Sequence, residues 1–105
     1  MREKIVNEEI FGLGFSPRHK GFHYLSAAIG RLSTRTGYVS AGETYRMVGM
    51  AAREDWRRVE RCMRYAIHYA WEVNHGAIRE LFPETNTPPA PIEFIQAVLW
   101  RIADK

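Results

Sequence analysis

The fold is decided between residues 55 and 76, which read DWRRVERCMRYAIHYAWEVNHG. Neither proline nor glycine interrupts this stretch before Gly76, and Asp55 is a residue type that caps helix N-termini. The sequence therefore predicts one long helix over about residues 56–74, which the Asn74, His75 and Gly76 triplet ends.

The predicted helix has two unlike sides. At about 100° per residue, one side is apolar and suited to a core; it comprises Val59, Cys62, Met63, Ala66, Ala70 and Val73. The opposite side gathers charged and aromatic side chains at spacings that make them neighbours; these are Arg57, Glu60, Arg61, Arg64, Tyr65 and His68. In a DNA major groove, arginine can donate to guanine and glutamate can accept from cytosine. The same pattern also fits a solvated face with ion pairs between Glu60 and its arginine neighbours.

The segment before the long helix favours the first of these hypotheses. Ser40 and Glu43 form a Ser-x-x-Glu capping box, which predicts a helix that reaches about Ala52. A turn of two or three residues, between Arg53 and Asp55, then leads into the long helix. A short helix, a tight turn and an arginine-bearing helix have the spacing of a helix-turn-helix. Both hypotheses for the exposed face remain open at this point.

The rest of the chain also predicts helices. A first short helix carries apolar residues between Ile5 and Leu13 and ends at Gly14, and a second is expected to begin at Pro17, capped by Ser16, and to run to about Leu32. A brief helix follows over residues 77–82. An extended loop is then expected at the prolines Pro83, Pro88, Pro89 and Pro91. The final helix has an apolar stripe of Phe94, Ile95, Val98, Leu99 and Ile102. We therefore expect an all-α bundle of about six helices, folded as a single domain over residues 1–105.

Composition limits the class of protein. The chain has 105 residues, 46% of them hydrophobic, and a net charge of +3, which permits an anionic partner. Only Lys4, Lys20 and Lys105 of the 15 basic residues are lysine; the others are arginine, which suits phosphates and guanine edges. The single cysteine excludes an internal disulfide, and neither a signal peptide nor a membrane span is evident. We expect a cytoplasmic protein.

Enzymatic and metal-binding patterns are weak. His19 and His23 are four residues apart, a spacing that can hold a metal, but no third ligand follows, so we predict neither metal nor cofactor. Cys62 lies on the apolar stripe and has no evident base, and no carboxylate pair sits in an apolar setting. The sequence thus predicts a protein that is not an enzyme. Trp56, Trp71 and Trp100 are most simply packing residues, although Trp56, at a helix start, would also suit a position beside a phosphate and Trp100 a protein contact.

Residues 57–71, RRVERCMRYAIHYAW, resemble a known family. The matching positions are Arg58, Val59, Glu60, Arg61, Arg64, Ala66, Ile67, Ala70 and Trp71. The family is the C-terminal DNA-binding effector domain of the stage-zero sporulation response regulator of spore-forming Firmicutes. Weaker similarities lie at residues 13–14, 20–25 and 93–98. At residues 54–57 the family has small hydroxyl residues, whereas this chain has Glu-Asp-Trp-Arg.

The resemblance implies a six-helix fold that binds a short promoter element of double-stranded DNA through the major groove. It also implies copies arranged in tandem that touch through helices including the last, with RNA polymerase as a further partner. By position, the base-reading residues would be Glu60, Arg61 and Arg64. The DNA-backbone or flanking residues expected around them are Arg18, Lys20, Arg57, Arg58, Tyr65 and His68. The family's receiver domain is absent from these residues, so the chain is either an excised effector domain or a stand-alone relative. The alternative function is a helical protein-interaction module, using Trp100 and the last helix, that kept the fold without specific DNA binding.

Overall fold

The computed structural model describes residues 2–33 and 40–103. Within these ranges the chain forms six helices and no strand, so the all-α prediction is confirmed. The helices are α1 (Arg2–Phe11), α2 (Lys20–Leu32), α3 (Ala41–Ala52), α4 (Trp56–Val73), α5 (His75–Arg79) and α6 (Pro91–Ala103).

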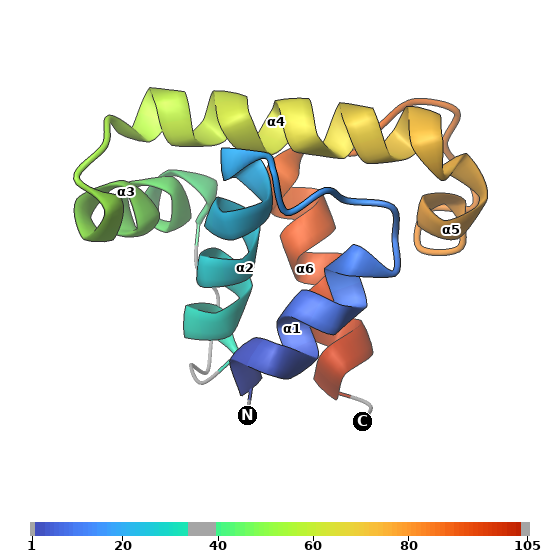
Figure 1. Cartoon of the computed structure of the whole chain (residues 1–105), viewed down its shortest axis with the longest axis horizontal. Coiled ribbons are helices and arrows are strands. Elements are labelled where there is room, and N and C mark those ends of the chain that lie inside the picture. Colours follow the sequence, from blue (N-terminus) through green and yellow to red (C-terminus); the bar gives the residue numbers. More distant parts are fainter. Residues whose placement is uncertain (1, 34–39, 104–105) are drawn as a thin grey trace.

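The helices are arranged around α4, which lies across one end of α2 and α6 (Figure 1). The α2 helix makes the most extensive contact with α4, and α3 packs beneath the N-terminal half of α4. The α1 helix packs on α2 and α6, on the far side of the molecule from α4. One long side of α4 is therefore left uncovered by the described chain.

The core is built from the apolar faces of all six helices. Its largest fully buried side chains are Phe94, Ile10, Leu25, Ile29, Met63, Ile67, Ile78, Ile95, Val6, Val48, Val59 and Val98. Burial of this many aliphatic side chains is the main favourable term in folding. None of the helices in the described ranges has both the length and the apolar character needed to cross a bilayer.

The buried side of α4 differs in part from the predicted stripe. Val59, Met63, Ala66 and Ala70 are buried as predicted, but Val73 is 61% exposed and Cys62 is only half-buried. Ile67 and Trp71 are buried in their place. At about 100° per residue the buried arc is centred near Met63 and is rotated toward Ile67 and Trp71, which leaves Cys62 and Val73 at its edge.

The predicted start of the second helix was wrong. The α2 helix begins at Lys20, and the Ser16 hydroxyl accepts the Arg18 amide, at 3.3 Å, within the preceding turn. His19 has extended backbone angles and stands at the N-cap position, so a helix cannot run through it from Pro17. The α2 helix is therefore shorter at its N-terminal end than the sequence pattern predicted.

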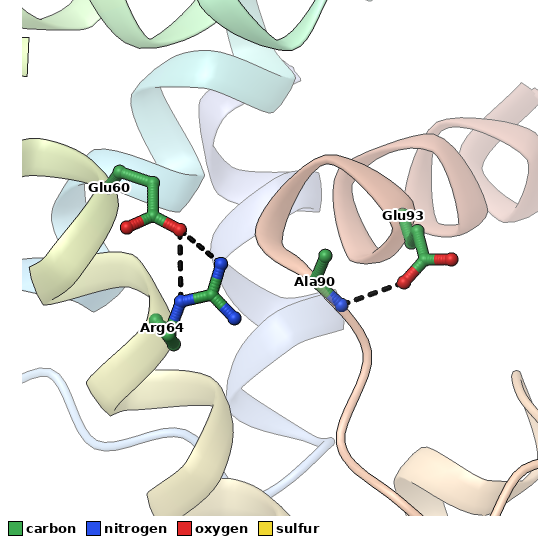
Figure 2. A network of polar contacts seen from close by, with 4 residues as sticks. All are labelled: Glu60, Arg64, Ala90 and Glu93. Carbon is green, nitrogen blue, oxygen red and sulfur yellow. Dashed lines mark hydrogen bonds and ion pairs between the residues drawn. The ribbon is translucent and has the colours of Figure 1, made fainter. Parts of the chain in front are cut away.

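Two further boundaries near the C-terminus differ from the prediction. The brief fifth helix spans His75–Arg79 rather than residues 77–82. Pro91 opens α6 instead of extending the loop, because proline is tolerated at the first position of a helix, where its missing N–H is not needed. The Glu93 carboxylate accepts the Ala90 amide at 2.8 Å and caps this helix start (Figure 2).

The turn between α3 and α4 is as short as predicted and has no glycine at its left-handed position. Arg53 takes that conformation, with φ 58°. The Glu54 amide donates to the Gly49 carbonyl at 2.8 Å, and the Arg53 amide donates to that of Met50 at 3.4 Å, the two bonds of a Schellman motif. A Cβ on Gly49 would lie 2.6 Å from the Glu54 carbonyl oxygen, so glycine is needed where the turn packs this closely against α3.

The start of α3 is capped as the sequence predicts. The Ser40 hydroxyl accepts the Glu43 amide at 3.2 Å, which confirms the predicted cap.

Candidate nucleic-acid interface

The uncovered side of α4 carries the charged face that the sequence predicts. Asp55 caps the helix by accepting the Arg57 amide at 2.7 Å, as expected from its position. The exposed side chains along this face are Arg57, Arg58, Arg61, Arg64, Tyr65 and His68. Glu60 is only partly exposed, because the buried arc is rotated toward it and its angle falls between those of the buried Ile67 and Trp71.

Glu60 and Arg64 form an ion pair one helical turn apart. The Arg64 Nε donates to Glu60 Oε2 at 2.9 Å, and the pair lies on the side of α4 toward the first turn of α6 (Figure 2). The second predicted pair, between Arg57 and Glu60, is replaced by a contact between Arg57 and Asp55 at 3.6 Å. Arg58 approaches Glu54 at 3.7 Å. Part of the face therefore has the ion pairs expected of a solvated surface.

Arg61 differs from its neighbours. At about 100° per residue its side chain projects near the middle of the exposed side of α4, opposite the buried arc centred on Met63. It is exposed, and within the described ranges it has neither an ion pair nor a side-chain hydrogen bond. Its guanidinium donors are thus directed to solvent and are available to an external acceptor.

The start of α2 packs closely on the middle of α4 at Gly21. A Cβ on Gly21 would lie 2.0 Å from the Cys62 carbonyl oxygen and 2.8 Å from the Ala66 Cβ. Only a residue without a side chain allows the two backbones to approach this closely. Lys20, which is exposed and directly precedes Gly21, is consequently close to α4, although it is distant from it in sequence; Arg18, also exposed, lies in the turn before α2.

An aromatic contact reinforces this junction. The His19 ring packs edge-on against the rings of Tyr65 and Tyr69, with centroid distances of 5.2 and 4.7 Å. Its Nδ1 is buried without a hydrogen-bond partner in the described chain, while His23 Nε2 contacts the Pro17 carbonyl at 2.7 Å. The two histidines therefore take part in separate packing contacts. Within the described ranges, no three His, Cys, Asp or Glu side chains are grouped as metal ligands would be.

The pKa values of two tyrosines, Tyr45 and Tyr24, are raised. Burial raises the pKa of the Tyr45 phenol and the Glu60 carboxylate raises it further, whereas a backbone hydrogen bond from Ile92 and the Arg64 charge lower it. Burial is also the main cause that raises the pKa of Tyr24, which lies near Glu54 and Arg58.

The chain matches a family model over residues 6–102, that of the sporulation initiation factor Spo0A C-terminal domain. The chain belongs to this family. The Spo0A C-terminal family is one of DNA-binding effector domains and not a class of enzymes, so the protein is a DNA-binding regulator in general terms. A comparison with curated proteins gives no match.

Two features of the interface were not predicted from the sequence. Arg46, whose guanidinium lies over the Trp56 ring, was not among the predicted residues, because spacing within a helix does not show that a side chain of α3 reaches the start of α4. Outside the interface, Trp100 is 78% exposed, which disagrees with a packing role and leaves the protein contact that was its alternative. The close approach at Gly21 had one signal, the Lys-Gly-Phe string shared with the family, but its partner Cys62 could not be identified from the sequence.

Proposed function

We propose that this protein is a sequence-specific transcription regulator that places α4 in the major groove of double-stranded DNA. The observation that carries the proposal is Arg61, exposed and unpaired within the described chain, near the middle of the one side of α4 that no other described helix covers. A guanidinium in this position can donate two parallel hydrogen bonds to guanine O6 and N7. Arg61 is therefore the principal base-reading residue.

Glu60 and Arg64 complete the proposed reading group once their ion pair opens. An i,i+4 pair on a helix surface contributes only about 0.3–0.5 kcal/mol, whereas a bidentate contact to the right base is worth about 1–3 kcal/mol of discrimination. DNA can therefore compete for Arg64 at little cost. Glu60, released from Arg64, would accept a hydrogen bond from a cytosine amino group.

The surrounding cations position the helix on the DNA backbone. Lys20 and Arg18 lie at and just before the start of α2, which packs on the middle of α4, while Arg57 and Arg58 lie in the first turn of α4. Contacts of this kind fix the orientation on DNA without carrying sequence information. Tyr65 and His68, both exposed on the same face, are placed to reach phosphates or sugars.

We propose in addition that copies associate in tandem on DNA through α6, as the family resemblance implies. Its support is Trp100, a large aromatic side chain exposed on that helix, because such residues are enriched in protein interfaces. Sedimentation of the protein on duplexes that carry one or two sites tests this: Trp100→Ala should abolish cooperative occupancy of the second site. Unchanged cooperativity would exclude Trp100 from the contact. A contact with RNA polymerase stays a prediction.

Selection from random duplex DNA tests the proposed function. The wild-type protein should enrich one motif, and Arg61→Ala should weaken binding to it by about 1–3 kcal/mol while relaxing the preference at one base pair. Lys4→Ala is the matched control, because Lys4 is an exposed cation on α1, on the far side of the molecule from α4. If no motif is enriched even at low salt, specific DNA binding is refuted and the interaction-module alternative is favoured.

A further inference from the structure

A tryptophan at the start of α4 holds two arginines from different helices. The guanidinium carbon of Arg46, on α3, lies 5.4 Å from the centroid of the Trp56 ring, and that of Arg57, on α4, lies 5.3 Å from it. Both distances fall within the range of cation–π attraction, about 6 Å. The indole thus brings together two positive charges that would otherwise repel each other.

The turn between the two helices positions Trp56 beside α3. Trp56 is the first residue of α4 and is partly buried against the core. Its backbone lies close to α3, since its Cα is 3.5 Å from the position that a Cβ on Gly49 would take. Arg46 and Arg57 are therefore held relative to α4 through a ring that the helix-turn-helix backbone positions.

The carboxylates near this cluster are largely engaged in other contacts. Asp55 caps α4 and touches Arg57 at 3.6 Å, Glu54 pairs with Arg58, and Glu43 contacts the Ser40 hydroxyl that caps α3. Within the described ranges Arg46 has no carboxylate partner, and both it and Arg57 are exposed. The cluster therefore presents guanidinium donors whose charge is only partly compensated.

We propose that Arg46, Trp56 and Arg57 form a clamp for the DNA phosphate backbone at the entry of α4 into the groove. This proposal rests on the proposed function, to which it adds a binding site that includes α3. Guanidinium groups bind phosphate oxygens with paired hydrogen bonds, and a ring that restrains them lowers the conformational entropy lost on binding. The clamp fixes the angle at which α4 meets DNA and reads no base itself.

The salt dependence of binding is the direct readout of such a clamp. Each phosphate contact adds about 0.9 to the slope of log affinity against log salt on duplex DNA. Arg46→Gln should therefore lower the magnitude of that slope by about 0.9, should weaken all duplexes by a similar factor and should leave the selected motif unchanged. Lys4→Gln, which removes the same charge from α1, on the far side of the molecule from α4, should leave the slope as in the wild type.

Trp56→Leu, alone and combined with Arg46→Gln, tests whether the ring organises the arginines. In the Trp56→Leu background Arg46→Gln should change the slope by less than half as much as in the wild type, because an Arg46 guanidinium that no ring restrains contributes less to the phosphate contact. Circular dichroism and thermal unfolding establish that each variant is folded. If Trp56→Leu is unfolded, Trp56→Phe replaces it and should give an intermediate coupling.

Two results would overturn the clamp. One is a slope for Arg46→Gln equal to that of Lys4→Gln; the other is an effect of Arg46→Gln that is the same with and without the indole. Because the slope can be measured on any duplex, either result is distinct from failure of the proposed function, which appears as the absence of an enriched motif.

Discussion

Replacing Gly21 by alanine tests whether α2 is held against α4 by backbone contact. The added Cβ would lie 2.0 Å from the Cys62 carbonyl oxygen and 2.7 Å from its carbonyl carbon, whereas ordinary contact starts at 3.4 Å. Both atoms belong to the backbone in the middle of α4, so no side chain can move aside. The start of α2 must therefore shift away from α4 by a large part of the missing distance.

The expected cost follows from a comparison with Gly30 in the same helix. A Cβ on Gly30 meets nothing within 4 Å, so Gly30→Ala should stabilise the protein by up to about 1 kcal/mol through helix propensity. Gly21→Ala gains a comparable propensity term but forces extra volume into a packed contact, which costs about 1–3 kcal/mol or more. The difference between the two variants isolates that packing cost.

Urea unfolding of both variants measures this difference, and a duplex-binding assay follows its consequence. Gly21→Ala should have a lower free energy of unfolding than Gly30→Ala by about 1–3 kcal/mol. It should also bind DNA more weakly when fully folded, because Lys20 moves with the helix start. Equal stability and equal affinity of the two variants would refute the placement of α2 on α4.

Three further substitutions probe the turn, a buried phenol and a cap. Gly49→Ala should destabilise the protein and weaken DNA binding in a filter or polarisation assay, because its Cβ meets a carbonyl oxygen at 2.6 Å, whereas Gly42→Ala, with its nearest contact at 3.7 Å, should not. The raised pKa of Tyr45 means that its contribution to stability is present below about pH 10 and is lost as pH rises through the folded-state pKa. The loss of unfolding free energy at high pH should therefore be smaller in Tyr45→Phe than in the wild type, and a loss equal to that of the wild type would contradict this. Asp55→Ala should cost about 1 kcal/mol in thermal unfolding through loss of the α4 cap, and Asp55→Asn should restore most of it.

The elements that the sequence predicted well are those set by local interactions. The long helix follows from an uninterrupted run of helix-compatible residues behind Asp55, and the start of α3 follows from the Ser40 hydroxyl. The boundary at Lys20 was missed because Ser16 and Pro17 also fit a turn, and the extended backbone at His19 is what decides between them. Caps and turns use the same residue types, so such boundaries depend on context.

The candidate interface was predictable only in part. Periodicity identified Arg61 as exposed and gave Glu60 two arginine partners at suitable spacing, but it could not tell that Arg64 pairs with Glu60 while Arg57 contacts Asp55. The rotation of the buried arc toward Ile67 and Trp71 depends on how α2, α3 and α6 pack on α4, which the period of a single helix does not contain. The contact of Arg46 with the indole is likewise a tertiary contact between helices.

The central claim is that Arg61 contacts a base edge in the major groove, and replacing single guanines of the selected site by 7-deazaguanine tests it most directly. This analogue lacks the N7 acceptor but keeps Watson–Crick pairing, so it removes half of a bidentate arginine contact. At one guanine the replacement should weaken wild-type binding by about 1 kcal/mol or more and should have no effect on Arg61→Ala. If Arg61→Ala remains as sensitive as the wild type at every guanine, Arg61 does not read the site through guanine and the assignment of the reading face is wrong.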